Sequence, residues 1–263
     1  EGVDATLAIM YVNDMLEDTP KEEYLWLKYH NGKVNLVVNI ITRNMDQCNL
    51  GNCKYSMQQT VDQRNRVTTA ARNAGMKLLT PVHGSDRLLL PPSSGRIEDT
   101  KWTSSAGADL IIREALKCTK EKPLVILIGG QATTVANAYL KNPAIADRVF
   151  VIHVNGYRDR PTIARGFNTL DPWSAYVVMK KMRYINFHGD EHSWYKGRNS
   201  NLTQAMINTL PNQHFANSIK SWYSRFFRVE QMADAPPVLY LYHPSLWRNV
   251  VRKLENGQTT TSD

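Results

Sequence analysis

Short apolar runs of strand length alternate with amphipathic segments along this 263-residue chain. The apolar runs predict strands at residues 33–42, 76–82, 123–128, 147–154, 184–187 and 237–242. Apolar residues at helical spacing predict helices at residues 62–74, 106–118, 133–140, 171–182 and 246–254. Residues 3–16 also show helical spacing, with Asp4 placed to cap the first turn. We therefore predict that the chain begins with a helix and lacks the strand that would precede it.

Strands that alternate with helices of about ten residues or more predict parallel pairing through right-handed crossovers. The expected fold is a doubly wound α/β domain with a mostly parallel sheet and helices on both faces, formed by residues 1–263 as a single domain. Residues 190–230 interrupt the alternation and predict a helical insertion. Ligands of such folds bind beyond the carboxyl ends of the strands. We expect Gly129-Gly130 and Val154-Asn155-Gly156 to meet at that edge.

Composition and charge narrow the classes of partner. The chain is 42% hydrophobic and has no apolar run near the roughly 20 residues that cross a membrane, so we expect no membrane partner. Its 32 Lys and Arg against 24 Asp and Glu give a net charge of +8, which favours anionic partners. Basic residues are scattered, and Lys180, Lys181 and Arg183 form the one dense group. This distribution favours an ordinary solvated surface over a nucleic-acid site.

Two features favour an oxidising compartment. Cys48 and Cys53 lie five residues apart in a Gly- and Asn-rich segment and predict a small disulfide ring, which leaves Cys118 unpaired. Asn201-Leu202-Thr203 is an acceptor triplet for N-glycosylation. Together they favour a secreted protein. Free thiols and an unused triplet are the alternative, because one cysteine pair does not make a disulfide framework.

The common catalytic motifs are incomplete. Gly129-Gly130 lacks the third glycine of a dinucleotide site and the lysine of a phosphate-binding loop. The sequence from His188 to His192 fits a zinc-peptidase pattern that needs a helix, but it follows a predicted strand. The acids Asp14, Glu17 and Asp18 stand at the end of the first predicted helix, where solvent exposure explains them. For His83 and His153 a core or strand-end role is a commoner explanation than catalysis.

Several segments, in their order along the chain, resemble the nucleoside hydrolase family. Gly2 to Met10 resembles the N-terminal motif in which a first strand ends in an aspartate cluster and runs into an apolar helix. Other segments match in order, namely Pro81 to Gly84, Gly130 to Thr134 in place of Gly-Pro-Leu-Thr-Asn, Gly166-Phe167-Asn168 in place of Glu-Phe-Asn, Asp171-Pro172, and Tyr242-His243-Pro244 in place of His-Asp-Pro. The resemblance spans nearly the whole chain.

The resemblance implies a calcium-dependent N-glycosidase, in which carboxylates hold a metal that binds the ribose hydroxyls and a water. It implies that Asp4 is the catalytic base and a metal ligand. It also implies two further metal ligands, the carbonyl of Thr133 and the side chain of His243. The residues that it implies as contacts to the bound small molecule are His83, Asn155, Asn168 and Asp171. Ala5, His243 and Gly166 stand where the family has carboxylates. Calcium affinity falls with ligand charge, so we expect the calcium site to be weakened or lost.

Three classes of function stay open at this point. The first is a binding protein with a degenerate metal and ribose site, which binds a nucleoside or sugar-like ligand with little or no turnover. The second is an active calcium-dependent hydrolase of N-glycosidic bonds. The third is a structural or assembly subunit of a secreted complex, as a homo-oligomer or part of a larger assembly.

Overall fold

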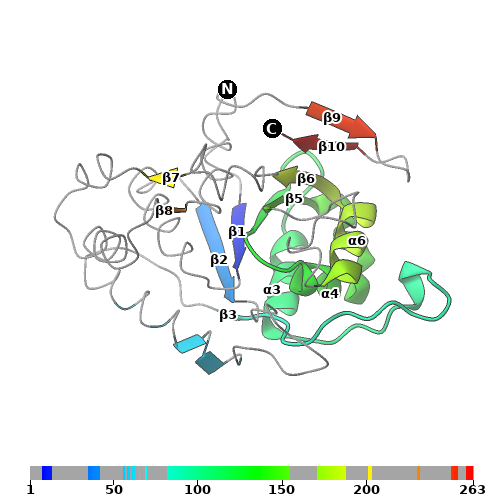
Figure 1. The fold of residues 1–263 in the computed structure, drawn as a ribbon, viewed down its shortest axis with the longest axis horizontal. Coiled ribbons are helices and arrows are strands. Elements are labelled where there is room, and N and C mark those ends of the chain that lie inside the picture. The colour runs from blue at the N-terminus through cyan, green and yellow to red at the C-terminus, as the bar shows by residue number, and fades with distance from the viewer. Residues whose placement is uncertain are drawn as a thin grey trace.

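The computed structural model describes residues 82–154 and 171–187 continuously, together with isolated residues between 56 and 69 and the strand segments 8–13, 35–41, 201–202, 230–231, 250–253 and 259–262. Figure 1 shows these parts as coloured elements on a grey trace. Among the described residues, no helix is both long enough and apolar enough to span a bilayer.

A six-stranded parallel sheet organises the described part of the chain. Its strands are β1 (Ala8–Asn13), β2 (Asn35–Ile41), β3 (Val82–His83), β4 (Leu124–Ile128), β5 (Val149–Val154) and β6 (Arg183–Phe187). Their order across the sheet is β3-β2-β1-β4-β5-β6, and every pairing in this sheet is parallel. The predicted doubly wound, parallel α/β fold is confirmed.

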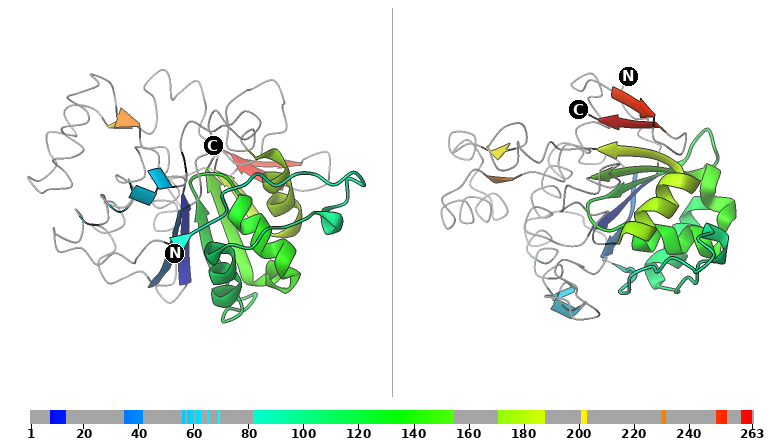
Figure 2. Two further views of the ribbon diagram at one scale, coloured as in Figure 1. Left: turned by 90° about the horizontal axis from the view of Figure 1, so that it is seen from below. Right: turned by 45° about the vertical axis from the view of Figure 1, so that its right-hand side comes forward.

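The described helices α3 (Ala106–Ala115), α4 (Thr133–Lys141) and α6 (Pro172–Lys181) cover one face of this sheet (Figures 1 and 2). The chain passes from β3 through β4 and β5 to β6 in one direction across the sheet, and right-handed crossovers place the three connecting helices on the same side. Apolar side chains of β4, β5 and these helices form the core, in which Ile126, Val135 and Val151 are completely buried.

Capping residues set the helix starts. Ser105 accepts a hydrogen bond from the Ala108 N–H at the start of α3, and Asp171 accepts one from the Ser174 N–H at the start of α6. Both starts agree with the predicted positions. Further upstream, Ser56 and Gln59 form a reciprocal capping box, in which each side chain accepts from the other residue's N–H. Gln58 and Gln59 are already helical, so this helix begins before the predicted Asp62.

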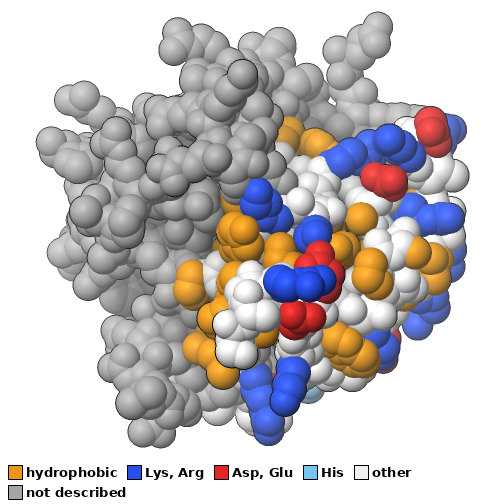
Figure 3. All heavy atoms as spheres, turned by 90° about the vertical axis from the view of Figure 1, so that its right-hand side faces the viewer, with side chains coloured by type: hydrophobic (Ala, Val, Ile, Leu, Met, Phe, Trp, Pro, Cys, Tyr) orange, Lys and Arg blue, Asp and Glu red, His pale blue; other side chains and the backbone are white. Residues whose placement is uncertain are grey.

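The connection from β3 to α3, residues 84–105, is a long excursion that we call the strap. It passes over the helical layer and includes the short 3₁₀ helix η1 (Ile97–Asp99) (Figure 2). The Trp173 ring N–H donates to the Thr100 hydroxyl, and the Lys181 ammonium donates to Glu98, so α6 holds the strap at two points. On the face shown in Figure 3, apolar side chains are interspersed with charged ones, and basic side chains cover more of the described surface than acidic ones.

Two predicted helices are wrong. Residues 8–13 of the predicted first helix form β1, an interior strand between β2 and β4. An interior strand of a parallel sheet typically has a nearly continuous apolar run in its sequence, and helical spacing can imitate such a run over one or two turns. Likewise, the predicted helix 246–254 contains strand β9 (Val250–Lys253), which pairs antiparallel with β10 (Thr259–Ser262).

Smaller differences concern boundaries and the insertion. The segment before β5 is the 3₁₀ helix η2 (Pro143–Arg148), so β5 begins two residues later than predicted. Within the predicted insertion, β7 (Asn201–Leu202) pairs antiparallel with β8 (Glu230–Gln231). The rest of that insertion and the predicted strand 237–242 lie outside the described residues.

Candidate functional site

The strand order locates the candidate site at the carboxyl ends of β1 and β4. Successive strands lead outward from β1 to β2 and β3 on one side, and from β4 to β5 and β6 on the other. The connections diverge at this switch point, and open α/β sheets bind their ligands at such a point. On the β4 side of the switch point, the buried turn Gly129 to Ala132 leads into α4.

The turn after β4 is fixed from the neighbouring strand. Ile128 pairs with His153 of β5, so the Gly129-Gly130 turn and Val154 lie beside each other at the carboxyl edge, as predicted. Nε2 of His153 lies 2.8 Å from the Gly130 carbonyl oxygen, and its Nδ1 lies 3.2 Å from the Tyr184 hydroxyl. His153 is completely buried, so the expectation of a satisfied core histidine is confirmed.

The carboxylate of Asp171 accepts hydrogen bonds from three segments near this turn. One oxygen, Oδ2, accepts from the Thr133 hydroxyl at 2.5 Å and from the Leu89 N–H of the strap at 3.2 Å. The other, Oδ1, accepts from the Ser174 N–H at 3.2 Å. Burial raises the pKa of this carboxyl, although the hydrogen bonds from Thr133, Ser174 and Leu89 oppose that shift. Asp171 therefore connects α4, α6 and the strap.

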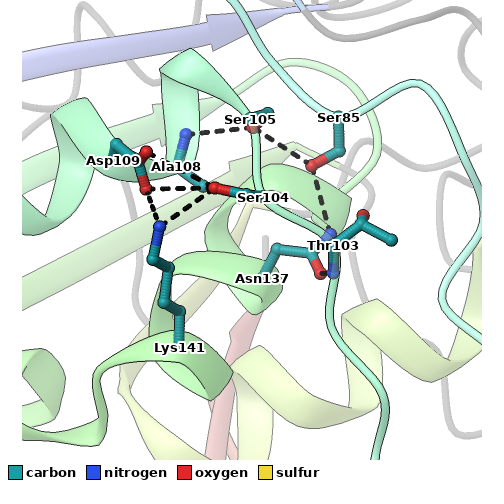
Figure 4. Close-up of polar contacts among 8 residues, drawn as sticks. All are labelled: Ser85, Thr103, Ser104, Ser105, Ala108, Asp109, Asn137 and Lys141. Carbon is teal, nitrogen blue, oxygen red and sulfur yellow. Dashed lines mark hydrogen bonds and ion pairs between the residues drawn. The ribbon is translucent and has the colours of Figure 1, made fainter.

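A second polar cluster joins α4 to the two ends of the strap, which lie side by side and which we call its neck (Figure 4). The side-chain amide of Asn137 donates to the Ser85 hydroxyl at 3.1 Å, and its oxygen accepts from the Thr103 N–H at 2.8 Å. The Ser85 N–H donates in turn to the Thr134 hydroxyl at 2.9 Å. Asn137 is completely buried and so joins both ends of a 22-residue excursion from Gly84 to Ser105.

The outer side of the same neck carries an exposed ion pair. Lys141 donates hydrogen bonds to Asp109 at 2.5 Å and to the Ser104 hydroxyl at 2.9 Å (Figure 4). Its ammonium also lies 5.5 Å from the centre of the Trp102 ring. Solvent screens this pair, so we attribute the position of the neck to the buried Asn137 contacts and not to Lys141.

The structure brings together two of the predicted site residues, Thr133 and Asp171. The Thr133 carbonyl, the predicted metal ligand, accepts a hydrogen bond from the Asn137 side chain at 3.0 Å. Asp171, a predicted ligand contact, is 1% exposed and has protein donors on both oxygens. His83 is exposed at the end of the edge strand β3. Ligand roles for these residues remain predictions.

The other predicted residues are not placed by the described structure. Asp4, Asn155, Asn168 and His243 lie outside the described residues, as do Cys48 and Cys53. Asn201 lies in β7, where it pairs with Gln231. Cys118 is a free, half-buried thiol.

The position of β1 changes which acids follow the central strand. Asp4 precedes Ala8, the first residue of β1, whereas a ligand site of this fold class lies at the carboxyl end, after Asn13. The acids that follow this end in the sequence are Asp14, Glu17 and Asp18. Sequence reasoning assigned them to the exposed end of a helix and so missed them as site candidates. The available signal was the uninterrupted apolar run from Leu7 to Val12.

The described residues do not by themselves fit a calcium ion. Calcium needs six to eight oxygens, several of them from carboxylates. No group of three or more His, Cys, Asp or Glu side chains with metal-binding geometry occurs among the described residues. Around the turn, the Gly130 carbonyl oxygen is hydrogen-bonded to His153. The Asp171 carboxylate already accepts hydrogen bonds from three protein donors. The described part of this turn therefore does not supply a set of calcium ligands.

Comparison with known proteins identifies the fold. No protein-family model matches the sequence, and no curated protein matches it. Solved structures match over nearly the whole chain, and three of them illustrate the likeness. An inosine-uridine preferring nucleoside hydrolase from Bacillus anthracis has a TM-score of 0.65 and 12% identity, over 98% of this chain and 93% of its own. A plant nucleoside hydrolase has a TM-score of 0.64 and 12% identity, over 97% and 86%.

The third is the type III effector protein XopQ, solved in complex with adenosine diphosphate ribose. It matches with a TM-score of 0.63 and 10% identity, over 97% of this chain and 86% of its own. At such low identity these matches establish the architecture, and they agree with the order of motifs that resembles nucleoside hydrolases. The chain therefore has the nucleoside hydrolase fold.

Proposed function

We propose that this protein binds a nucleoside or another ribose-containing ligand at the carboxyl edge of the sheet, between β1 and β4. The strand order supports the proposal, because the switch point lies between β1 and β4, and the Gly129-Gly130 turn follows β4. Proteins with this fold support the ligand class. Two of the matched structures are nucleoside hydrolases by name, and XopQ was solved with adenosine diphosphate ribose.

We further propose that turnover is slow or absent. Ala5, Gly166 and His243 stand at positions where the resemblance implies carboxylates. Among the described residues near the turn, Asp171 is the one buried acid, and its hydrogen bonds are made within the protein. Loss of a catalytic base typically costs about 10² to 10⁴ in rate. The described side of the site therefore supports binding better than catalysis.

Hydrolysis of an N-glycosidic bond is the second candidate, and the position of β1 favours it. The strand ends directly before Asp14, with Glu17 and Asp18 close behind in the sequence. Carboxylates at this edge would supply the negative charge that stabilises an oxocarbenium-like transition state and a base for the attacking water.

Calorimetric titration with inosine, uridine and adenosine diphosphate ribose, combined with an assay for released base with and without added calcium, tests both candidates. We expect binding of at least one ligand without release of base. Release at ordinary enzyme rates of roughly 1 to 10³ per second would establish the hydrolase instead. In that case the matched variants Asp14→Asn and Asp4→Asn identify which aspartate is required.

The compartment and assembly state belong to this proposal as well. We propose a secreted protein with a disulfide between Cys48 and Cys53 and glycan on Asn201, on the sequence signals alone. The intact mass of protein from a eukaryotic secretory host tests both modifications together. A mass equal to the bare, reduced chain would contradict the secreted assignment. If none of the three ligands binds and sizing shows a large assembly, the structural-subunit alternative stands.

A further inference from the structure

The strap carries most of the large apolar side chains that the described residues expose. Leu90 is 72% exposed, Trp102 43% and Leu88 41%, and the other such side chain in the described part of the chain is Leu116, at the end of α3. Exposed apolar residues that are scattered singly are normal in folded proteins. Three on one connection form a local concentration, and apolar surface that is gathered in this way marks a site of interaction.

Two contacts with α6 bring these side chains together. The outgoing leg of the strap is held where the Leu89 N–H donates to Asp171, and the returning leg is held where the Thr100 hydroxyl accepts from Trp173. Both partners belong to the start of α6, so the two legs cross this helix side by side (Figure 1). The exposed leucines flank the first contact along the chain, and Trp102 follows the second. The three apolar side chains therefore lie on neighbouring legs of the strap.

The strap presents these side chains on a fixed backbone. Leu89 is 4% exposed and packs in the hydrophobic core, while the leucines on both sides of it are exposed. At the neck, the buried Asn137 holds both legs. A surface that is already held in place loses little conformational entropy when a partner binds. The anchors of the strap therefore favour its use as a binding surface.

The exposed charges next to these apolar residues are basic. The acids of the strap each take part in an interaction within the protein, namely Asp86, Glu98 and Asp99. Arg87 and Lys101, in contrast, form no ion pair or hydrogen bond with any residue that the structure describes. Arg87 directly precedes Leu88, and Lys101 directly precedes Trp102. We call these three apolar and two basic residues the strap surface, which consists of Arg87, Leu88, Leu90, Lys101 and Trp102.

We propose that the strap surface binds an acidic segment of another protein, one that also carries apolar side chains. The apolar residues supply area that a partner removes from water, and the two cations select a partner of negative charge. A second copy of this chain is a poor partner, because a two-fold contact of the strap surface with itself would bring four cations together. This inference does not depend on the proposed ligand site at the switch point.

An anionic bilayer is also a poor partner for the strap surface. Negatively charged lipids attract surfaces on which basic residues are clustered and acids are absent. The tip of the strap carries Glu98 and Asp99, whose side chains are 55% and 48% exposed. A bilayer in contact with the strap would be close to these carboxylates, whereas a peptide can follow the legs and avoid the tip. The charges therefore favour a peptide over a lipid surface.

Selection from a library of random peptides displayed on phage, against the immobilised full chain, tests the proposal. We expect the enriched peptides to contain an excess of Asp and Glu together with apolar residues, and to bind Leu90→Ser about tenfold or more weakly than the wild type. Leu116→Ser is the matched control, because it removes an exposed leucine outside the strap, and it should stay within about twofold. Thermal unfolding shows that both variants are folded.

Charge reversal tests the electrostatic half of the proposal. The double variant Arg87→Glu, Lys101→Glu should also bind the enriched peptides about tenfold or more weakly, and added salt should weaken their binding to the wild type. Enriched peptides that are basic or uncharged, or a selection without any peptide that depends on Leu90, would overturn the proposal.

Two further measurements identify the other possible occupants. Dimerisation of the wild type that Leu90→Ser abolishes, seen by analytical ultracentrifugation, would make a second copy the occupant and overturn the proposal. Sedimentation with phosphatidylserine vesicles that Leu90→Ser abolishes would make a membrane the occupant and overturn it as well. Neither measurement involves a nucleoside, so failure of the strap surface and failure of the proposed ligand site are distinguishable.

Discussion

Single buried polar side chains hold the described half of the candidate site in place. Asp171 is the clearest case, because its two oxygens accept from Leu89, Thr133 and Ser174. In Asp171→Asn one oxygen becomes an NH₂ group, which cannot accept, and at least one buried donor loses its partner. We expect the free energy of unfolding to fall by about 1 to 3 kcal/mol. Denaturant unfolding measures this, and the exposed acid Asp99, as Asp99→Asn, is the matched control.

The stability difference between the wild type and Asp171→Asn should depend on pH in a definite direction. Burial raises the pKa of Asp171 above its ordinary value of 3.8, so the folded protein binds this proton more tightly than the unfolded chain does. The contribution of Asp171 to stability therefore grows as the pH falls from the raised pKa towards 3.8. We expect the stability difference between the wild type and Asp171→Asn to widen on acidification from neutral pH. A difference that narrows over this range would contradict the raised pKa.

At Gly107, helix α3 lies so close to the end of β3 that the position has no room for a side chain. A Cβ atom there would lie 2.9 Å from the Gly84 Cα, 2.9 Å from the Ile40 Cγ2 and 3.0 Å from the His83 carbonyl oxygen. We expect Gly107→Ala to lower the free energy of unfolding by about 1 to 3 kcal/mol, because α3 must move away from the end of β3. Gly95 is the control, since nothing lies within 4 Å and Gly95→Asn retains a residue that tolerates its positive φ of 68°. Equal losses at both positions would contradict this explanation.

At the scale of elements, the strap depends on a few buried anchors at its neck. Asn137 joins Ser85 to Thr103, so Asn137→Ala should release both ends of residues 84–105 while the sheet stays folded. We expect faster amide hydrogen exchange across the strap and a stability loss of about 2 kcal/mol. Lys141→Ala, which removes the exposed ion pair at the same neck, should leave exchange in the strap nearly unchanged. The reverse order of effects would show that the ion pair fixes the neck.

The elements that sequence predicted correctly are those with a strong local signal. Strand β4 is an uninterrupted buried run from Leu124 to Ile128, and α6 starts with an aspartate cap followed by Pro172. The interior strand β1 was missed because its short apolar run also fits a helical period. For β9 the overlooked signal was Asn256-Gly257, a hairpin dipeptide between the two β-branched segments that pair.

The candidate site was less predictable than the fold, because its contacts depend on tertiary structure. The sequence indicated Gly129-Gly130 and Asp171 as notable, since each adjoins a strand end or a helix start. It did not indicate that His153 holds the Gly130 carbonyl, or that Leu89 donates to Asp171 from 82 positions away. A hydrogen bond over such a separation leaves no periodic trace in the sequence. The set of acids at the switch point likewise depended on locating β1 correctly.

For the whole molecule, the strand order makes the N-terminal segment central. The first strand in the sequence lies between β2 and β4, so it pairs on both edges and joins the two halves of the sheet. Strands β9 and β10 pair with each other in a separate two-stranded sheet. If the chain is a single cooperative domain, these two terminal segments should differ sharply in their contribution to folding.

We expect a chain that lacks residues 1–13 to lose the cooperative thermal transition, because β2 and β4 would each have an unpaired edge in the middle of the sheet. A chain that lacks residues 250–263, and so both β9 and β10, should unfold in one transition at a lower temperature. Calorimetry and far-ultraviolet circular dichroism of the two truncated chains test this difference. A cooperative transition in the chain without β1 would show that the sheet folds without its central strand, and the switch point between β1 and β4 would then lose its structural role.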